Sequence, residues 1–146
     1  CFSSYFMADQ EINMDDVVIY CDGGSRGNPG PSALGVVIKT TKGEIIEEIG
    51  EFLGEQTNNY AEYMAVVKAL EFVKAKNISK ARFYLDSELV VKQLNGLYKI
   101  KSDNIKHLYQ KVNELRQGIS VTFDHVYREH NKEADAIVNQ VLDSIK

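Results

Sequence analysis

Cysteine is scarce in this sequence, and long apolar runs are absent. Cys1 and Cys21 are its two cysteines, and neither stands in a Cys-x-x-Cys or Cys/His ligand pattern, so no disulfide framework or zinc motif is expected. No apolar stretch approaches the roughly 20 residues that a membrane-spanning helix needs, so we expect no membrane partner. Because Cys21 lies inside an apolar run, as a small core residue would, we favour a reducing compartment and expect a cytoplasmic protein.

Positive charge is also in short supply. Lysine and arginine number 17 against 21 acids, which gives a net charge of -4 and a pI near 5.4. Nucleic-acid-binding domains are usually basic, so the total charge alone argues against such a partner. Acids gathered around a metal ion would, however, lower the total charge and leave basic residues free elsewhere. Charge therefore does not exclude a nucleic-acid partner.

The chain is long enough for one domain with its own core. Its 146 residues need no disulfide or metal to hold a fold together. We find no repeat, linker or low-complexity tract. The sequence therefore predicts a single domain at 15–146, preceded at 1–14 by an N-terminal tail that has no clear periodicity.

Hydrophobic periodicity predicts an α/β fold. An apolar run at 17–21 indicates a central strand that ends in Asp22 and leads into a glycine-rich loop. The other expected strands lie at 33–39, 44–53, 81–85 and 119–127, and the expected helices lie at 59–75, 89–94, 105–115 and from 131 onward. The order βββαβααβα predicts a mixed five-stranded sheet, with three antiparallel strands followed by two parallel ones, flanked by helices.

Four acids share a placement in this pattern. Asp22 and Asp86 end predicted strands, whereas Glu62 and Asp135 fall in the first turns of predicted helices. Taken alone, Glu62 and Asp86 could have a purely structural role. Asn59-x-x-Glu62 fits a helix-capping pattern, and Asp86 could cap the next helix. Asp135 borders the apolar stripe of the last helix, where a charge is costly unless it is paired or bound to metal.

Taken together, the acids indicate a metal site. Converging carboxylates repel one another and raise each other's pKa values, a conflict that a divalent cation removes. An all-oxygen site suits Mg²⁺ or Mn²⁺. Two ions about 4 Å apart can hold the attacking and leaving oxygens of a phosphodiester. The placement of the acids thus predicts a metal-dependent phosphoryl-transfer site.

The same residues lie in stretches that closely resemble the type 1 ribonuclease H family. The first reads Tyr-Cys-Asp22-Gly-Gly-Ser-Arg-Gly-Asn-Pro-Gly-Pro, and the others are Thr-Asn-Asn-Tyr-Ala-Glu62-Tyr, Asp86-Ser-Glu-Leu-Val-Val and Arg-Glu-His-Asn-Lys-Glu-Ala-Asp135. They stand in the family's order, and the resemblance covers the chain from Asp16 onward. It implies a ribonuclease H-like fold and a hydrolase, an endonuclease that cleaves the RNA strand of RNA–DNA hybrids and leaves 5′-phosphate and 3′-hydroxyl ends.

The resemblance also implies roles for individual residues. The four acids would be catalytic and would hold two Mg²⁺ ions, for which Mn²⁺ could substitute, and water activated on one metal would attack the phosphorus. Contacts to the hybrid would come from seven residues: Gly23, Asn28, Thr57, Asn58, Asn59, Ser87 and Ser102. The asparagines can form hydrogen bonds with 2′-hydroxyls. Alternatively, they could stabilise turns or cap helices, which asparagines commonly do. We expect the protein to act as a monomer.

Three departures from the family pattern stand out. The stretch 95–103 passes directly into the next helix where many members carry a lysine-rich protrusion, so the chain resembles the compact form, and weaker hybrid binding is expected. His130 lies in a shortened loop where many members place a mobile histidine, and it is either an auxiliary catalytic residue or simply solvated. Ser102 stands where relatives often have an asparagine, and its hydroxyl can still donate to a phosphate.

Two other functions fit parts of the pattern. The same fold and metals serve resolvases, transposases and exonucleases, but the asparagines at 28, 58 and 59 favour a ribonuclease. A hybrid-binding module without catalysis usually lacks one or more acids, and this chain retains all four. The sequence leaves open whether the chain is free-standing or part of a larger protein, which metal it prefers and whether it cuts duplex RNA.

Overall fold

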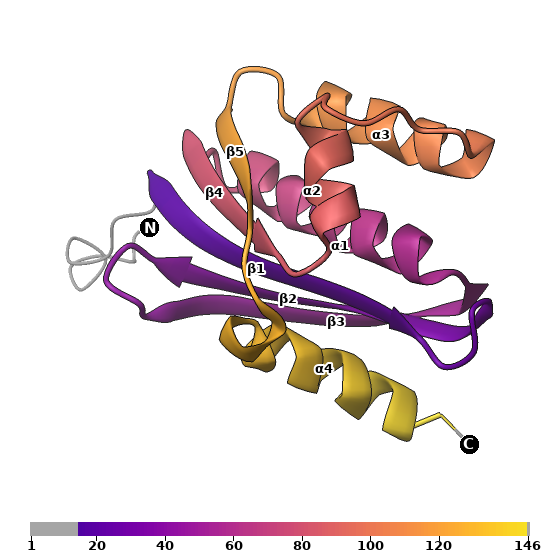
Figure 1. Ribbon diagram of the computed structural model, residues 1–146. Helices are drawn as coiled ribbons and strands as arrows, with labels where there is room; N and C mark the ends of the chain where they lie inside the picture. Colours follow the sequence, from indigo (N-terminus) through magenta and orange to yellow (C-terminus); the bar gives the residue numbers. More distant parts are fainter. Residues whose placement is uncertain (1–14, 146) are drawn as a thin grey trace.

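The computed structural model describes residues 15–145, so the predicted tail at 1–14 lies outside the described residues. Strands and helices follow one another in the predicted order βββαβααβα (Figure 1). The elements are β1 (Asp16–Ser25), β2 (Gly30–Thr40), β3 (Ile45–Gln56), α1 (Asn58–Ala75), β4 (Lys80–Leu85), α2 (Glu88–Leu94), α3 (Asp103–Leu115), β5 (Ser120–His125) and α4 (Lys132–Asp143). Among these described helices, none is long and apolar enough to cross a membrane.

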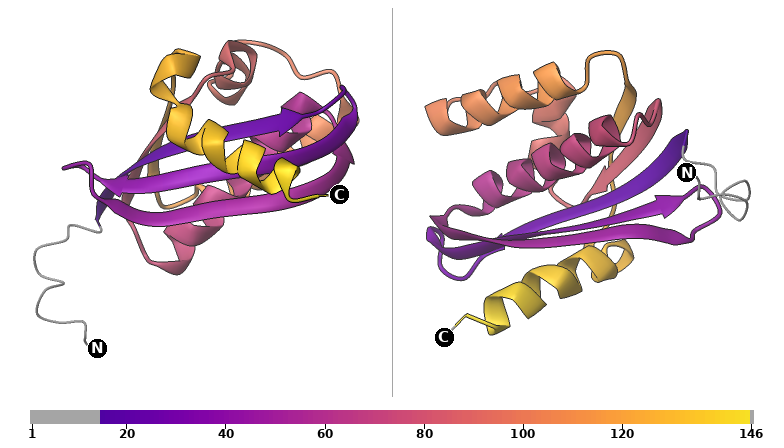
Figure 2. Two further views of the ribbon diagram at one scale, coloured as in Figure 1. Left: turned by 90° about the horizontal axis from the view of Figure 1, so that it is seen from below. Right: turned by 180° about the vertical axis from the view of Figure 1, so that it is seen from behind.

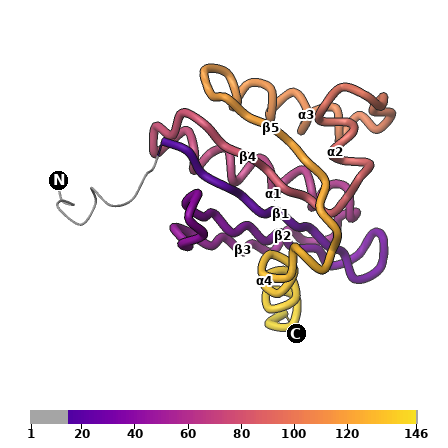
Figure 3. Tube along the Cα trace, turned by 60° about the vertical axis from the view of Figure 1, so that its left-hand side comes forward, coloured from indigo at the N-terminus to yellow at the C-terminus, as the bar shows by residue number. Residues whose placement is uncertain are grey.

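The strands form one mixed sheet in the order β3-β2-β1-β4-β5. β2 pairs antiparallel with β1 and β3, whereas β4 pairs parallel with β1 and β5. Figure 3 shows β1 in the middle of this arrangement, with β4 beside it and β5 on the far side of β4. The predicted sheet of three antiparallel strands followed by two parallel strands is therefore confirmed.

The main core lies between the sheet and α1. Val17, Ile19 and Cys21 alternate along β1 and are fully buried, as are Phe83 and Leu85 on β4. α1 is apolar around most of its circumference, which is typical of a helix buried in the centre of a protein. α2 and α3 lie on this same side of the sheet, so three helices cover one face (Figures 1 and 2).

Among the described helices, α4 is the one that covers the opposite face, across the antiparallel half of the sheet (Figure 2). Its buried residues Val138 and Leu142 pack with Ala33 of β2. Gly35 permits this close approach, because a Cβ there would lie 2.4 Å from the carbonyl oxygen of Ala134. The helix that carries Asp135 is thereby held against the centre of the sheet.

Several element ends differ from the sequence prediction. β2 begins at Gly30 instead of 33 and β3 ends at Gln56 instead of 53, because these two ends pair with each other. β1 continues through Ser25 instead of ending at Asp22, because 23–25 keep their pairing with β2. The strand predicted at 119–127 ends at His125, and a short 3₁₀ turn at Arg128–His130 then leads into α4. The prediction counted the apolar alternation up to Tyr127, whose side chain is exposed and packs against His125 instead of the core.

Candidate active site

The topology brings the four acids to one place. Parallel pairing of β1 with β4 stops at Cys21 and Leu85, so Asp22 and Asp86 follow directly at neighbouring positions. Asp135 lies in the first turn of α4, as predicted. Glu62 lies one turn further into α1 than predicted, because the helix begins at Asn58 and its first turn holds no acid. The two helices lie on opposite faces of the sheet (Figure 2).

Three of the acids are close enough to share an ion. Asp22, Glu62 and Asp86 each offer a carboxylate oxygen, and these oxygens lie within 4.8 Å of one another. Asp135 lies against Asp22 and lines the same cleft. Asp22 and Glu62 are 6% and 4% exposed, whereas Asp86 and Asp135 are half-buried. The site thus combines a buried pair with a more accessible one.

The acids line an open cleft of about 460 Å³. Its other walls come from the end of β1 and the residue after it, the first turn of α1, the N-cap of α2, the 3₁₀ turn and one side of α4. The lining residues are Asp22, Gly23, Gly24, Ser25, Arg26, Asn58, Asn59, Glu62, Asp86, Ser87, Arg128, Asp135, Val138, Asn139 and Leu142. Asn58, Asn59, Ser87 and Gly23, all predicted to touch substrate, therefore lie beside the four acids.

Burial and mutual repulsion raise the pKa values of the buried pair. Desolvation is the largest cause of the raised pKa of Asp22, and the side chain of Glu62 opposes it. The charges of Asp86 and Asp135 add to the rise, and the pKa of Asp22 reaches about 7. Desolvation and the neighbouring Asp22 raise the pKa of Glu62 well above its ordinary value. Charged carboxylates at this point are costly without a cation.

Gly23 joins the two buried acids. Its backbone N–H donates to Oε1 of Glu62 at 2.8 Å and to Oδ1 of Asp22 at 3.0 Å. A Cβ at this position would lie 2.3 Å from the backbone carbonyl carbon of Ala61, so α1 rests directly on β1 and leaves room for glycine alone. Gly23 therefore orients both carboxylates, in addition to its predicted contact with substrate.

The residues fit a hard divalent cation. Within residues 15–145, Oε2 of Glu62 is buried and has no hydrogen-bond partner. An unpaired buried carboxylate oxygen is unusual and calls for an ion or a proton. The surrounding donors are all oxygens, which is the ligand chemistry of Mg²⁺ and Mn²⁺.

The loop after β1 is braced to the start of α1 by two asparagines. Oδ1 of Asn28 accepts from the backbone N–H of Asn58 at 3.0 Å, and Oδ1 of Asn58 accepts from the N–H of Ser25 at 2.8 Å. Neither side-chain NH₂ group has a protein partner in the described part of the chain, so both remain available as donors. Asn28 and Asn58 can therefore brace the backbone with their oxygens and still contact substrate with their NH₂ groups.

Three predicted substrate contacts are helix caps. The hydroxyl of Thr57 accepts from the N–H of Tyr60 at 3.2 Å, and that of Ser102 accepts from Ile105 at 3.4 Å. Neither residue lines the acid cleft. Ser87 caps α2 by accepting from Val90 at 3.3 Å, and it does line the cleft.

His130 and Arg128 lie on different sides of the 3₁₀ turn. His130 is exposed and lines a separate depression of about 210 Å³ with Tyr20, Lys39 and Glu133. The turn instead directs Arg128 to the acid cleft, where no ion pair holds it among the described residues. Neither prediction for His130, as an auxiliary catalytic residue or as a solvated side chain, is tested by this placement. The sequence analysis assigned no role to Arg128. The signal that could have indicated one is its position just before the helix that carries Asp135.

Comparison with known proteins identifies the family. Residues 20–141 match the model of the Reverse transcriptase-like family. Ribonuclease HI of Halobacterium salinarum is 40% identical over 127 residues, which cover 85% of this chain and 63% of the relative. Ribonuclease H of Ruthia magnifica subsp. Calyptogena magnifica is 32% identical over 148 residues, which cover 90% of this chain and 99% of the relative.

Solved structures agree with the sequence relatives. RNase H1 from Halobacterium salinarum NRC-1 superposes with a TM-score of 0.84 and 39% identity, over 88% of this chain and 98% of that one. LC11-RNase H1, solved in complex with an RNA/DNA hybrid, has a TM-score of 0.83 and 38% identity, over 87% of this chain and 96% of that one.

Some relatives are much longer than this chain. It spans 63% of the Halobacterium protein and 36% of a mycobacterial relative named Bifunctional protein Rv2228c. The match to the family model nevertheless covers most of the chain, and the match to the Ruthia protein covers nearly all of that relative. The chain therefore belongs to the ribonuclease H family.

Proposed function

We propose that this protein is a metal-dependent endoribonuclease that cleaves the RNA strand of RNA–DNA hybrids and leaves 5′-phosphate and 3′-hydroxyl ends. The observation that carries the proposal is the convergence of Asp22, Glu62 and Asp86 within 4.8 Å, in a cleft that Asp135 also lines. The similarity to LC11-RNase H1, which was solved with an RNA/DNA hybrid, supports this substrate.

The four acids would hold two divalent cations, Mg²⁺ with Mn²⁺ as a substitute. Bound cations would neutralise the carboxylates and supply positive charge for a phosphodiester and an attacking water. Glu62 would use its unpartnered Oε2, while Gly23 keeps Oε1 in place through its N–H. All of these residues come from one chain, which supports action as a monomer.

Arg128 would act on the substrate phosphate. It lines the cleft with Asp86, Ser87 and Asp135, and its side chain is exposed. A guanidinium binds phosphate oxygens in a bidentate way. The arginine would stabilise the negative charge that grows on the phosphate during attack.

The loop after β1 would read the RNA strand. The free NH₂ groups of Asn28 and Asn58 are donors, and a 2′-hydroxyl is the acceptor that separates RNA from DNA. Their oxygens are tied to backbone N–H groups, so the donors are held in place before substrate arrives. Thr57 and Ser102 begin two helices that run in the same direction (Figure 1), and they would bind a phosphate of the DNA strand.

A cleavage assay tests the proposal. Purified protein is incubated with labelled RNA–DNA hybrid, duplex RNA, single-stranded RNA and single-stranded DNA, each in Mg²⁺, Mn²⁺ or EDTA. We expect cutting of the RNA in the hybrid, dependent on the metal, with 5′-phosphate ends, and no cutting by Asp86→Asn. If the protein binds the hybrid but does not cut it in either metal, the binding-module alternative replaces the nuclease.

A further inference from the structure

Asn131 is a buried polar residue that the proposed reaction leaves unused. It lies between the 3₁₀ turn and α4, and it is 1% exposed. It occupies the N-cap position of α4, where an asparagine side chain ordinarily accepts a bond from its own helix. Its side chain makes no such bond.

The side chain instead reaches the acids. Its Nδ2 donates to the carbonyl oxygen of Cys21 at 2.8 Å and to Oδ2 of Asp86 at 3.2 Å. Its own backbone carbonyl accepts from the N–H of Asp135 at 3.1 Å. Cys21 directly precedes Asp22, so one asparagine joins the segments that carry three of the four acids.

The bond to Asp86 has a direct consequence for a cation ligand. An N–H that donates to Oδ2 fixes the plane of the carboxylate group of Asp86. Oδ1 of Asp86 has no protein partner within residues 15–145, so it is left to a ligand. Outer residues that orient metal ligands in this way control both affinity and reactivity.

We propose that Asn131 is a positioning residue that holds Asp86, and with it the start of α4, in the geometry that binds the catalytic cations. This inference rests on the proposed function, because it assumes that the acids bind metal. Oδ1 of Asn131 is also buried and unpartnered among the described residues. A residue that served the fold alone would have used that oxygen to cap α4.

A matched asparagine separates positioning from simple bracing. Asn95 ends α2, and its Nδ2 donates to the carbonyl oxygen of Phe123 on β5 at 3.1 Å. It therefore also ties a helix end to a strand through an amide, but it does not line the acid cleft. Replacement of Asn95 by alanine therefore measures how much such a helix-to-strand hydrogen bond contributes to stability, separately from any effect on metal binding.

The experiment compares Asn131→Ala and Asn95→Ala with the unaltered chain. Calorimetry measures Mg²⁺ and Mn²⁺ binding without substrate, and hybrid binding is measured in EDTA. We expect Asn131→Ala to lower metal affinity and kcat by about 10–100-fold, with KM and metal-free hybrid affinity nearly unchanged. We expect Asn95→Ala to lower Tm but to keep metal affinity and kcat.

Two results would overturn the inference: a folded Asn131→Ala that binds metal as well as the unaltered chain, or an Asn95→Ala that loses as much metal affinity. If circular dichroism shows that Asn131→Ala is unfolded, Asn131→Ser takes its place under the same criteria. The metal-binding arm also separates this inference from the proposed function. Weaker metal binding by the variant, in a chain that never cuts hybrid, would contradict only the nuclease proposal.

Discussion

At the scale of single residues, Gly23 marks the point where a strand and a helix touch. A methyl group there would meet the backbone of Ala61 and Glu62 at 2.3–2.6 Å, and backbone atoms cannot move aside as a side-chain tip can. The residue also orients Glu62 and Asp22 through its N–H. Fold and catalysis therefore depend on the same missing side chain.

We predict that Gly23→Ala lowers the free energy of unfolding by about 2–4 kcal/mol and abolishes cleavage of the hybrid. Gly24→Ala is the matched control, because its Cβ would meet only the Cγ1 of Val138, at 3.3 Å. Urea unfolding of both variants gives the comparison. Equal losses at the two positions would contradict the packing argument.

The raised pKa of Asp22 makes a prediction about pH. Its pKa is about 7 in the folded protein against an ordinary value of 3.8, so between these values the folded state holds a proton that the unfolded state has lost. Stability of the metal-free protein must then fall as pH rises from about 4 through about 7. We expect Tm in EDTA to decrease from pH 5 to pH 8.

Two controls identify the source of that slope. Asp22→Asn removes the titrating group and should flatten the dependence of Tm on pH. Mg²⁺ should stabilise most at the alkaline end, where the carboxylates are charged and can bind it. A Tm in EDTA that rises across this range would show that the buried acids do not govern it.

The first and last residues of the three-residue 3₁₀ turn make a natural pair for mutation. Arg128 lines the acid cleft, whereas His130 lines the depression beside Tyr20 and Lys39. We predict that Arg128→Ala lowers kcat about tenfold or more, and that His130→Ala leaves it nearly unchanged. Single-turnover cleavage of the hybrid measures both, and a large loss with His130→Ala alone would reverse the assignment.

At the scale of elements, α4 depends on glycines in the strands beneath it. A Cβ at Gly35 would meet the carbonyl oxygen of Ala134 at 2.4 Å, which is helix backbone, whereas one at Gly50 would meet only the side chains of Ile137 and Val141. Any lift of α4 also moves Asp135 away from the other acids. The close contact therefore has a functional consequence.

We predict that Gly35→Ala costs about 2–3 kcal/mol of stability and lowers kcat in the folded fraction, while Gly50→Ala costs about 1 kcal/mol. Thermal unfolding and steady-state kinetics of the two variants check this. The prediction fails if Gly50→Ala, which leaves the backbone of α4 in place, impairs turnover as strongly.

The elements also show how far sequence reasoning reached. Periodicity indicates which side of a strand or helix is buried, so the order of elements and the sheet follow from it. Periodicity does not locate the end of a strand that stops pairing with one neighbour and keeps pairing with the other. β1 stops pairing with β4 at Cys21 but pairs with β2 as far as Ser25, so it runs past Asp22. The bond from Asn131 to Asp86 joins residues 45 positions apart, and no local pattern encodes it.

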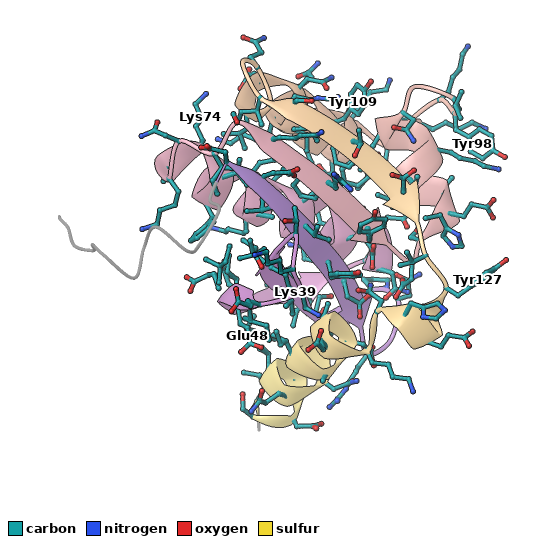
Figure 4. The ribbon with its side chains drawn as sticks, turned by 90° about the vertical axis from the view of Figure 1, so that its left-hand side faces the viewer. Lys39, Glu48, Lys74, Tyr98, Tyr109 and Tyr127 are labelled. Carbon is teal, nitrogen blue, oxygen red and sulfur yellow. The ribbon has the colours of Figure 1, made fainter. Side chains whose placement is uncertain are left out.

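At the scale of the whole molecule, positive charge near the cleft is limited. The loop between α2 and α3 holds Lys99 and Lys101 but no protrusion, and Tyr98 lies beneath the ammonium group of Lys92 at 5.1 Å. Figure 4 shows Tyr98 and Tyr127 projecting from the same edge of the molecule. This edge therefore carries two exposed aromatic side chains.

We predict that grafting a lysine-rich helix into the loop between α2 and α3 lowers KM for the hybrid by about tenfold at low salt and leaves kcat unchanged. The gain should shrink as salt is added, because it comes from released counterions. A graft with glutamines in place of the lysines is the control. No gain from the lysine graft would mean that weak hybrid binding has another cause.

The contact between α1 and β1 has a dynamic consequence as well. Glu62 belongs to the helix at the centre of the core, so its amide can exchange hydrogen with solvent only when the domain opens globally. The turn that bears Arg128 and the loop that bears Asn28 lie outside the core and can open by themselves. Hydrogen exchange should therefore be slow at the amide of Glu62 and fast in the turn with Arg128 and the loop with Asn28. These two segments could then be replaced, to change the preferred substrate, without disturbing the acids.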